Sequence, residues 1–160
     1  VSRVTDGQGR PLEHRFGPED KNLGKPFIIA LQPDTQRIVI HYTSAPDAEA
    51  LQWLTPEQTA GKKQPFLFSQ GQSIFNRSWI PTQDSPGIRQ TWEAKVSVDK
   101  PLTAVMSAPT AGTPLDTGDE RTFRFRMDKP VAPYLIAIAV GDLKFQPLGP
   151  RTGVWAEPVT

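Results

Sequence analysis

The chain has 160 residues, of which 37% are hydrophobic, and its 18 basic and 17 acidic side chains leave a formal charge of +1. This length allows one domain with a modest core, and a near-neutral charge without a basic stripe predicts that nucleic acid is not a partner. The absence of cysteine excludes disulfides, thiolate catalysis and sulfur-ligated metals, and it fits a cytoplasmic location and a bacterial periplasmic or secreted location equally well.

Alternation of apolar and polar residues, rather than helical periodicity, dominates the chain. Residues 37–42 show it first, and residues 90–98 and 122–127 show it again. The apolar faces of the last two segments carry, in order, Trp92, Ala94, Val96, Val98, Phe123, Phe125 and Met127. A period of two is typical of half-buried strands with one wet face.

One segment is apolar on both faces. Residues 135–140 therefore predict a central, fully buried strand, and weaker strand patterns occur at 102–108 and 153–155. The apolar run that contains this strand, residues 134–140, is much shorter than the roughly 18 residues that a membrane span needs. We therefore expect no membrane partner.

Turn-forming residues separate the strands, in clusters at 5–9, 32–34, 84–87 and 111–118, the last being a long polar hairpin loop. One helical turn is predicted at residues 55–58, with Thr55 as the cap, a proline at the first helical position and Gln58 completing a capping box. We expect Gly61 to end it. No segment predicts a helix of three turns or more, so the expected fold is all-β, an antiparallel sandwich or saddle.

Residues with the chemistry of a catalytic or metal site are scarce. The two histidines, His14 and His41, lie far apart in the sequence and belong to no H-E-x-x-H helix, so we expect both at the surface and no metal in this chain. Asp84 lies in an Asp-Ser-Pro-Gly turn, where a carboxylate accepts backbone N–H groups and can pair with Arg77 or Arg89. We therefore predict a structural role for Asp84 and no catalytic residue in the chain.

The remaining candidate binding features have simpler interpretations. Basic residues are frequent in the region from Lys95 to Lys129, but acidic residues are interleaved with them, which is typical of a solvated strand face. These basic residues are Lys95, Arg121, Arg124, Arg126 and Lys129, and the acidic ones are Asp119, Glu120 and Asp128. Trp92 lies on an apolar strand face and is expected in the core, whereas Trp53 and Trp79 border turns.

Four stretches of the sequence resemble one enzyme family. Residues 51–61 (LQWLTPEQTAG) and 65–72 (PFLFSQGQ) closely resemble the leukotriene hydrolase branch of the zinc aminopeptidases, a family of gluzincin metallopeptidases. Arg77 with residues 81–89 is similar to the proline–aspartate–proline signature that this branch shares with aminopeptidase N, and residues 149–157 look like the end of the family's N-terminal domain. The resemblance runs from about residue 50 to 157. Residues 1–49 agree only in pattern, and the loop at 110–117 diverges.

The resemblance implies a saddle-like β domain packed on a thermolysin-like catalytic domain within a zinc aminopeptidase that removes N-terminal residues from peptides. Zinc and its ligands would belong to the catalytic domain, so residues 1–160 are expected to form a single, non-catalytic domain that lacks its first strands and the catalytic domain. The expected partners are a peptide substrate and the parent enzyme's own catalytic domain. The alternative is an independent β-sandwich binding or adhesion module that uses exposed aromatic residues.

The resemblance also implies a site. Gln70, Gly71 and Gln72 are similar to the segment by which the N-terminal domain forms one wall of the substrate cleft and faces the first residue of the substrate. In an extended strand both glutamines would share a face with Phe66 and Phe68, and their neutral amides can donate and accept hydrogen bonds. Gly71 would let another chain approach closely, although vertebrate members of the branch carry a larger residue there. The competing interpretation is a pair of solvated glutamines on a strand.

Overall fold

The computed structural model describes all 160 residues and divides them into two compact units, Val1–Ser44 and Ala45–Thr160. Thirteen strands and three 3-10 helices of three or four residues make up the regular structure, and every strand pairing is antiparallel. The all-β antiparallel prediction is therefore confirmed. No helix in the chain reaches the length and hydrophobicity that crossing a bilayer requires.

The first unit consists of two small ladders, β1 (Arg3–Asp6) with β4 (Ile38–His41) and β2 (His14–Phe16) with β3 (Phe27–Ile29). Its predicted turn at residues 5–9 is organised by Asp6, whose side chain is fully buried. The Asp6 carboxylate accepts hydrogen bonds from the backbone N–H groups of Gln8 and Arg10, each at 2.9 Å. A carboxylate that is satisfied in this way fixes the turn that follows β1.

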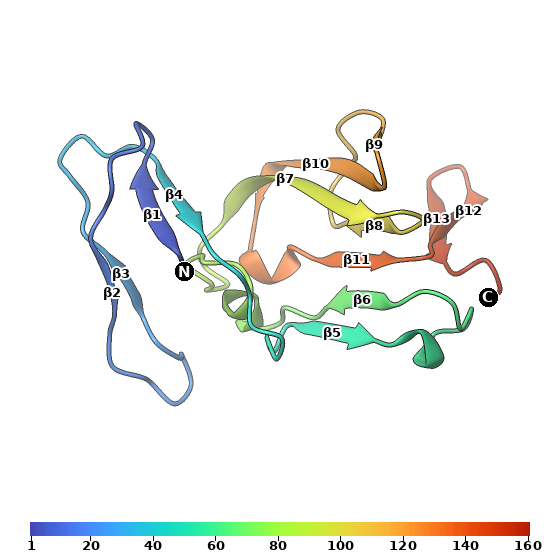
Figure 1. Ribbon diagram of the computed structural model, residues 1–160, viewed down its shortest axis with the longest axis horizontal. Helices are drawn as coiled ribbons and strands as arrows, with labels where there is room; N and C mark the ends of the chain where they lie inside the picture. Colours follow the sequence, from blue (N-terminus) through green and yellow to red (C-terminus); the bar gives the residue numbers. More distant parts are fainter. The chain divides into compact units, whose positions relative to one another are not determined.

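The second unit contains two larger sheets and a terminal hairpin (Figure 1). The four-stranded sheet has the order β5 (Leu51–Leu54), β6 (Phe66–Ser69), β11 (Ile138–Gly141) and β8 (Thr103–Met106). The three-stranded sheet has the order β7 (Gln90–Asp99), β10 (Glu120–Val131) and β9 (Leu115–Thr117). The hairpin pairs β12 (Lys144–Gly149) with β13 (Thr152–Ala156).

The core of this unit draws on both large sheets. Its fully buried members are Leu67, Ala104, Phe123, Phe125 and Val140, with half-buried apolar residues of β7 packed against them. Along β7 the apolar residues are half-buried and the intervening polar ones exposed, as the alternation predicts. Packing of the two inner faces therefore explains the period of two in the sequence.

Two elements differ from the sequence prediction. The predicted strand at 135–140 begins only at Ile138, because Pro133–Leu135 forms the 3-10 helix η3 with proline in its first turn. β11 is nevertheless a central strand between β6 and β8. The predicted loop at 111–118 contains β9, which pairs with β10 after a turn at Gly118, where φ is +57°.

The predicted helical turn is present as the 3-10 helix η1 (Pro56–Gln58). The Thr55 backbone N–H donates to Oε1 of Gln58 at 2.9 Å, as the capping box requires. The helix ends at Gln58, with Thr59 as its C-cap, rather than at Gly61. Gly61 has another role: its N–H and that of Ala60 donate to the carboxylate of Glu157 at 3.1 and 2.8 Å, which ties the end of the chain to this turn.

Candidate functional site

The Gln70–Gly71–Gln72 segment lies where β6 ends. β6 stops at Ser69, which pairs with Leu51 of β5, and only one more ladder bond follows, from the Gln70 N–H to the Ala50 carbonyl at 2.8 Å. The chain then turns, and the Gln72 N–H donates to Oε1 of Gln70 at 3.2 Å. Gln70 and Gln72 are both exposed, but the prediction that they continue an extended strand in register with Phe66 and Phe68 is wrong.

Gly71 is buried between the two exposed glutamines. A Cβ atom at this position would lie 2.4 Å from Oδ1 of Asn76 and 2.6 Å from its Cγ. Carbon atoms do not approach oxygen this closely, so a side chain at 71 requires Asn76 or the backbone to move. The space that glycine leaves here is filled from inside the domain by Asn76.

Asn76 is the buried support of the segment, and the sequence analysis missed it. It lies in the 3-10 helix η2 (Phe75–Ser78) and is 0% exposed. Its Nδ2 donates to the carbonyls of Pro133 and Ile136 at 2.6 and 2.8 Å, and its Oδ1 accepts the Trp79 indole N–H at 2.9 Å. The available signal was a single amide in a short segment with four large apolar residues, Ile74, Phe75, Trp79 and Ile80, because a buried amide needs partners.

Asp84 has the structural role that its turn predicts. Its side chain is fully buried, and Oδ2 accepts the Arg77 backbone N–H at 2.9 Å. The Arg77 guanidinium donates to the Asp84 carbonyl oxygen, and Arg77 Nε lies 3.9 Å from Oδ2. Of the two arginines considered as partners, Arg77 is therefore the one that pairs. The contact holds the end of η2 against the turn at 84–87.

The residues of this chain do not fit a zinc ion. His14 and His41 are both exposed and lie on β2 and β4, and Nδ1 of His14 is 3.1 Å from the Leu12 carbonyl. No group of three or more histidine, cysteine, aspartate or glutamate side chains comes together anywhere in the chain. A metal implied by the family would therefore need ligands from outside these residues.

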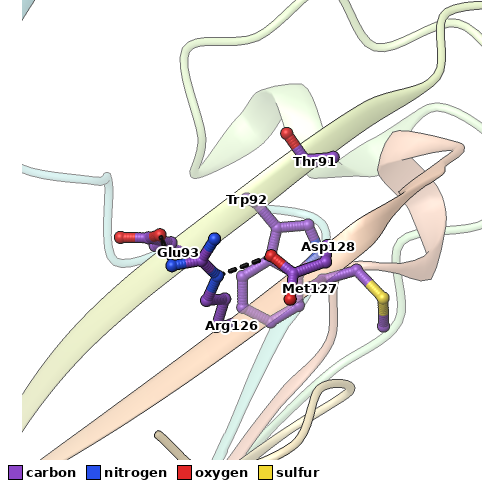
Figure 2. A pocket seen from close by; sticks show the side chains of 6 residues that line it. All are labelled: Thr91, Trp92, Glu93, Arg126, Met127 and Asp128. Atoms are coloured by element: carbon purple, nitrogen blue, oxygen red, sulfur yellow. Dashed lines mark hydrogen bonds and ion pairs between the residues drawn. The ribbon is translucent and has the colours of Figure 1, made fainter.

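The hollow between β7 and β10, of about 480 Å³, is separate from the glutamine segment. Figure 2 shows the side chains of Arg126 and Asp128, both from β10, pointing toward each other, with the Trp92 ring close by. Arg126 donates to Asp128 at 2.5 Å and lies 3.2 Å from Glu93, and all three side chains are largely exposed. Because these charges neutralise one another in solvent, this surface is the solvated strand face that the sequence predicts.

Antiparallel sheets, with a polar segment at the end of β6 that is supported by a buried amide, define an antiparallel β domain. The chain matches the family described as the Peptidase M1 N-terminal domain over residues 19–135, and it belongs to that family. The predicted family resemblance is confirmed.

Curated relatives cover most of the chain. It is 40% identical over 154 residues to leucine aminopeptidase 2 of Yarrowia lipolytica, covering 94% of this chain and 23% of that protein. It is 44% identical over 156 residues to leukotriene A-4 hydrolase of Xenopus laevis, covering 93% and 26%, and 48% identical over 106 residues to aminopeptidase B of Rattus norvegicus, covering 66% and 16%. The chain thus spans about a quarter or less of the length of these relatives.

Solved structures agree with the fold. Native yeast LTA4 hydrolase is similar with a TM-score of 0.84 and 32% identity, over 99% of this chain and 24% of that one. An M1 zinc metallopeptidase from Deinococcus radiodurans, at 20% identity and a TM-score of 0.64 over 97% of this chain and 36% of that one, shares the fold.

Proposed function

We propose that this chain is the non-catalytic N-terminal domain of a zinc metalloaminopeptidase that removes N-terminal residues from peptides, and that it forms one wall of the substrate cleft. The observation that carries the proposal is the pair of exposed amides, Gln70 and Gln72, on a fully buried and hydrogen-bonded support. The aminopeptidases among its relatives support the parent activity. Zinc would be held, and the peptide bond cleaved, by residues of the parent enzyme outside this chain.

The chemistry of the segment suits the recognition of a peptide N-terminus. A glutamine amide can accept a hydrogen bond from an α-ammonium group through its oxygen and donate to a backbone carbonyl through its nitrogen. Because it carries no charge, it does so without the desolvation penalty of a buried ion. Gln70 already uses Oε1 to hold the Gln72 N–H, so we assign the direct substrate contact to Gln72 and a supporting role to Gln70.

The test is steady-state kinetics of Gln72→Ala, Gln70→Ala and the double variant in the intact parent enzyme. Losing one hydrogen bond of a glutamine amide costs about 0.5–1.5 kcal/mol. A polar group of the substrate that is left buried without a partner raises the loss to about 3 kcal/mol. We therefore expect Gln72→Ala to lower kcat/KM on aminoacyl substrates by a few-fold to about a hundredfold. Zinc content and thermal stability should stay unchanged, since neither side chain is buried.

The matched control is Gln36→Ala, another exposed glutamine, in the first unit. It should leave kcat/KM at the wild-type value. Wild-type kinetics in all three segment variants would instead return Gln70 and Gln72 to the role of solvated surface residues.

A further inference from the structure

We propose that Asn76 is a positioning residue that sets the location of the Gln70–Gln72 segment, with Gly71 as its size-matched partner. The inference rests on the proposed function for its consequence in catalysis, but its structural content can be tested separately. Four contacts carry it: one steric contact with Gly71 and three hydrogen bonds of the Asn76 amide.

The hydrogen bonds fix the orientation of the Asn76 amide. Two of its neighbours are carbonyl oxygens, those of Pro133 and Ile136, which need donors, and the third is the Trp79 indole N–H, which needs an acceptor. Only one of the two amide orientations satisfies all three. Asn76 is therefore held in one place by Trp79, which follows η2, and by two carbonyls in and directly after η3.

The steric contact couples the position of Asn76 to the position of the Gln70–Gln72 segment. Because a Cβ at residue 71 would lie within 2.8 Å of the Oδ1, Cγ and Nδ2 atoms of Asn76, the Asn76 amide leaves no room for a side chain at Gly71. The Gly71 carbonyl also accepts the Phe75 N–H at 2.9 Å, which joins the segment to the start of η2. The two exposed glutamines flank Gly71, so a shift of Asn76 displaces both of them.

This geometry explains the glycine in physical terms. The φ angle of Gly71 does not lie in the left-handed region, so its conformation alone does not demand glycine. Glycine is required because the buried Asn76 amide lies too close for a Cβ atom at residue 71. Asn76 and Gly71 therefore form a pair in which the volume at one position determines the volume allowed at the other.

The experiment is a double-mutant cycle in the intact parent enzyme, with Gly71→Ala, Asn76→Ala and the combination. Misplacing a contact residue by about 1 Å can cost up to about a hundredfold in rate, so Gly71→Ala should lower kcat/KM per bound zinc by about tenfold or more. Asn76→Ala removes the atoms that the new methyl group meets. The loss in the double variant should therefore be at least about twofold smaller than the product of the two single losses.

Two matched controls come from the chain itself. Gly87→Ala adds a methyl group where nothing lies within 4 Å, and Asn22→Ala removes an exposed amide. Both should leave kcat/KM per bound zinc unchanged. Expressing activity per bound zinc separates positioning from folding, because a merely structural defect lowers the amount of loaded enzyme and not its kcat/KM.

Hydrogen exchange provides a readout that does not depend on activity. The Phe75 N–H, bonded to the Gly71 carbonyl, should exchange at least about tenfold faster in Asn76→Ala and remain as in wild type in Asn22→Ala. If Asn76→Ala does not fold, Gly71→Ala retains the Asn76 side chain and, by displacing the segment, should accelerate the same amide.

The outcomes separate the two proposals. Faster exchange together with wild-type kinetics of the Gln70 and Gln72 variants supports the positioning role and refutes the proposed function. Strictly multiplicative losses of kcat/KM in the cycle overturn the positioning role, even if Gln72→Ala lowers kcat/KM. Unchanged hydrogen exchange of the Phe75 N–H overturns it as well.

Discussion

Replacing Asp84 with alanine should destabilise the domain by about 2 kcal/mol and leave the chemistry of the parent enzyme unchanged. The Asp84 side chain is fully buried, and its Oδ2 is the acceptor of the Arg77 backbone N–H at 2.9 Å. Truncation leaves this N–H buried without an acceptor, which costs about 1–3 kcal/mol. The ion pair adds little, because Arg77 Nε is 3.9 Å away and its side chain is 30% exposed.

The assay is urea denaturation of the intact parent protein followed by tryptophan fluorescence, with Trp79 next to the affected helix as a local reporter. Asp128→Ala is the matched control: that carboxylate pairs with Arg126 but is 71% exposed, so its loss should cost no more than about 1 kcal/mol. Asp84→Ala should unfold at clearly lower urea with kcat per bound zinc preserved. An unchanged midpoint with a collapsed kcat would refute the structural role and make Asp84 catalytic.

Two further predictions concern charge and metal. Hydrogen bonding from Arg121 lowers the pKa of Asp116 to about 2 from 3.8, so its contribution to stability is complete above about pH 3.8 and is lost as the pH falls through about 2. Carboxyl NMR should show this midpoint, and Arg121→Gln should raise it toward 3.8; an unmoved midpoint contradicts the assignment. The isolated chain should keep no stoichiometric zinc after dialysis and turn over no aminoacyl reporter, because its two histidines share no ligand cluster; retained zinc or turnover would contradict this.

Strands with one solvent-exposed face and one buried face could be predicted from the sequence. The alternation in β7 and β10 reads directly from the sequence, because each side chain's burial depends on its own sheet face. β9 was missed because its three exposed residues pair only with the start of β10, so its polar sequence resembles a loop. The late start of the predicted strand at 135–140 depends on η3, whose apolar residues carry no periodic signal.

The backbone conformation of the candidate site could not be predicted from the sequence. The residues 70–72 come from a motif, whereas their backbone depends on where β5 stops pairing with β6, which only the assembled sheet decides. The prediction that Gln70 and Gln72 share the strand face of Phe66 and Phe68 assumed that β6 continues through residue 72. β6 instead ends at Ser69. Their assignment as substrate contacts stays a prediction for the kinetics described above.

Stability and function separate along this short segment, and the separation follows from burial. The amides of Gln70 and Gln72 are exposed, so removing either should cost the fold little and can affect only what binds there. Asn76, a few residues further on, is 0% exposed and satisfies three buried polar groups, so its loss affects the fold and the segment together. On our proposal, the buried Asn76 constrains the Gln70–Gln72 segment more than the exposed residues of the segment do, and Gly71 is the position through which the constraint acts.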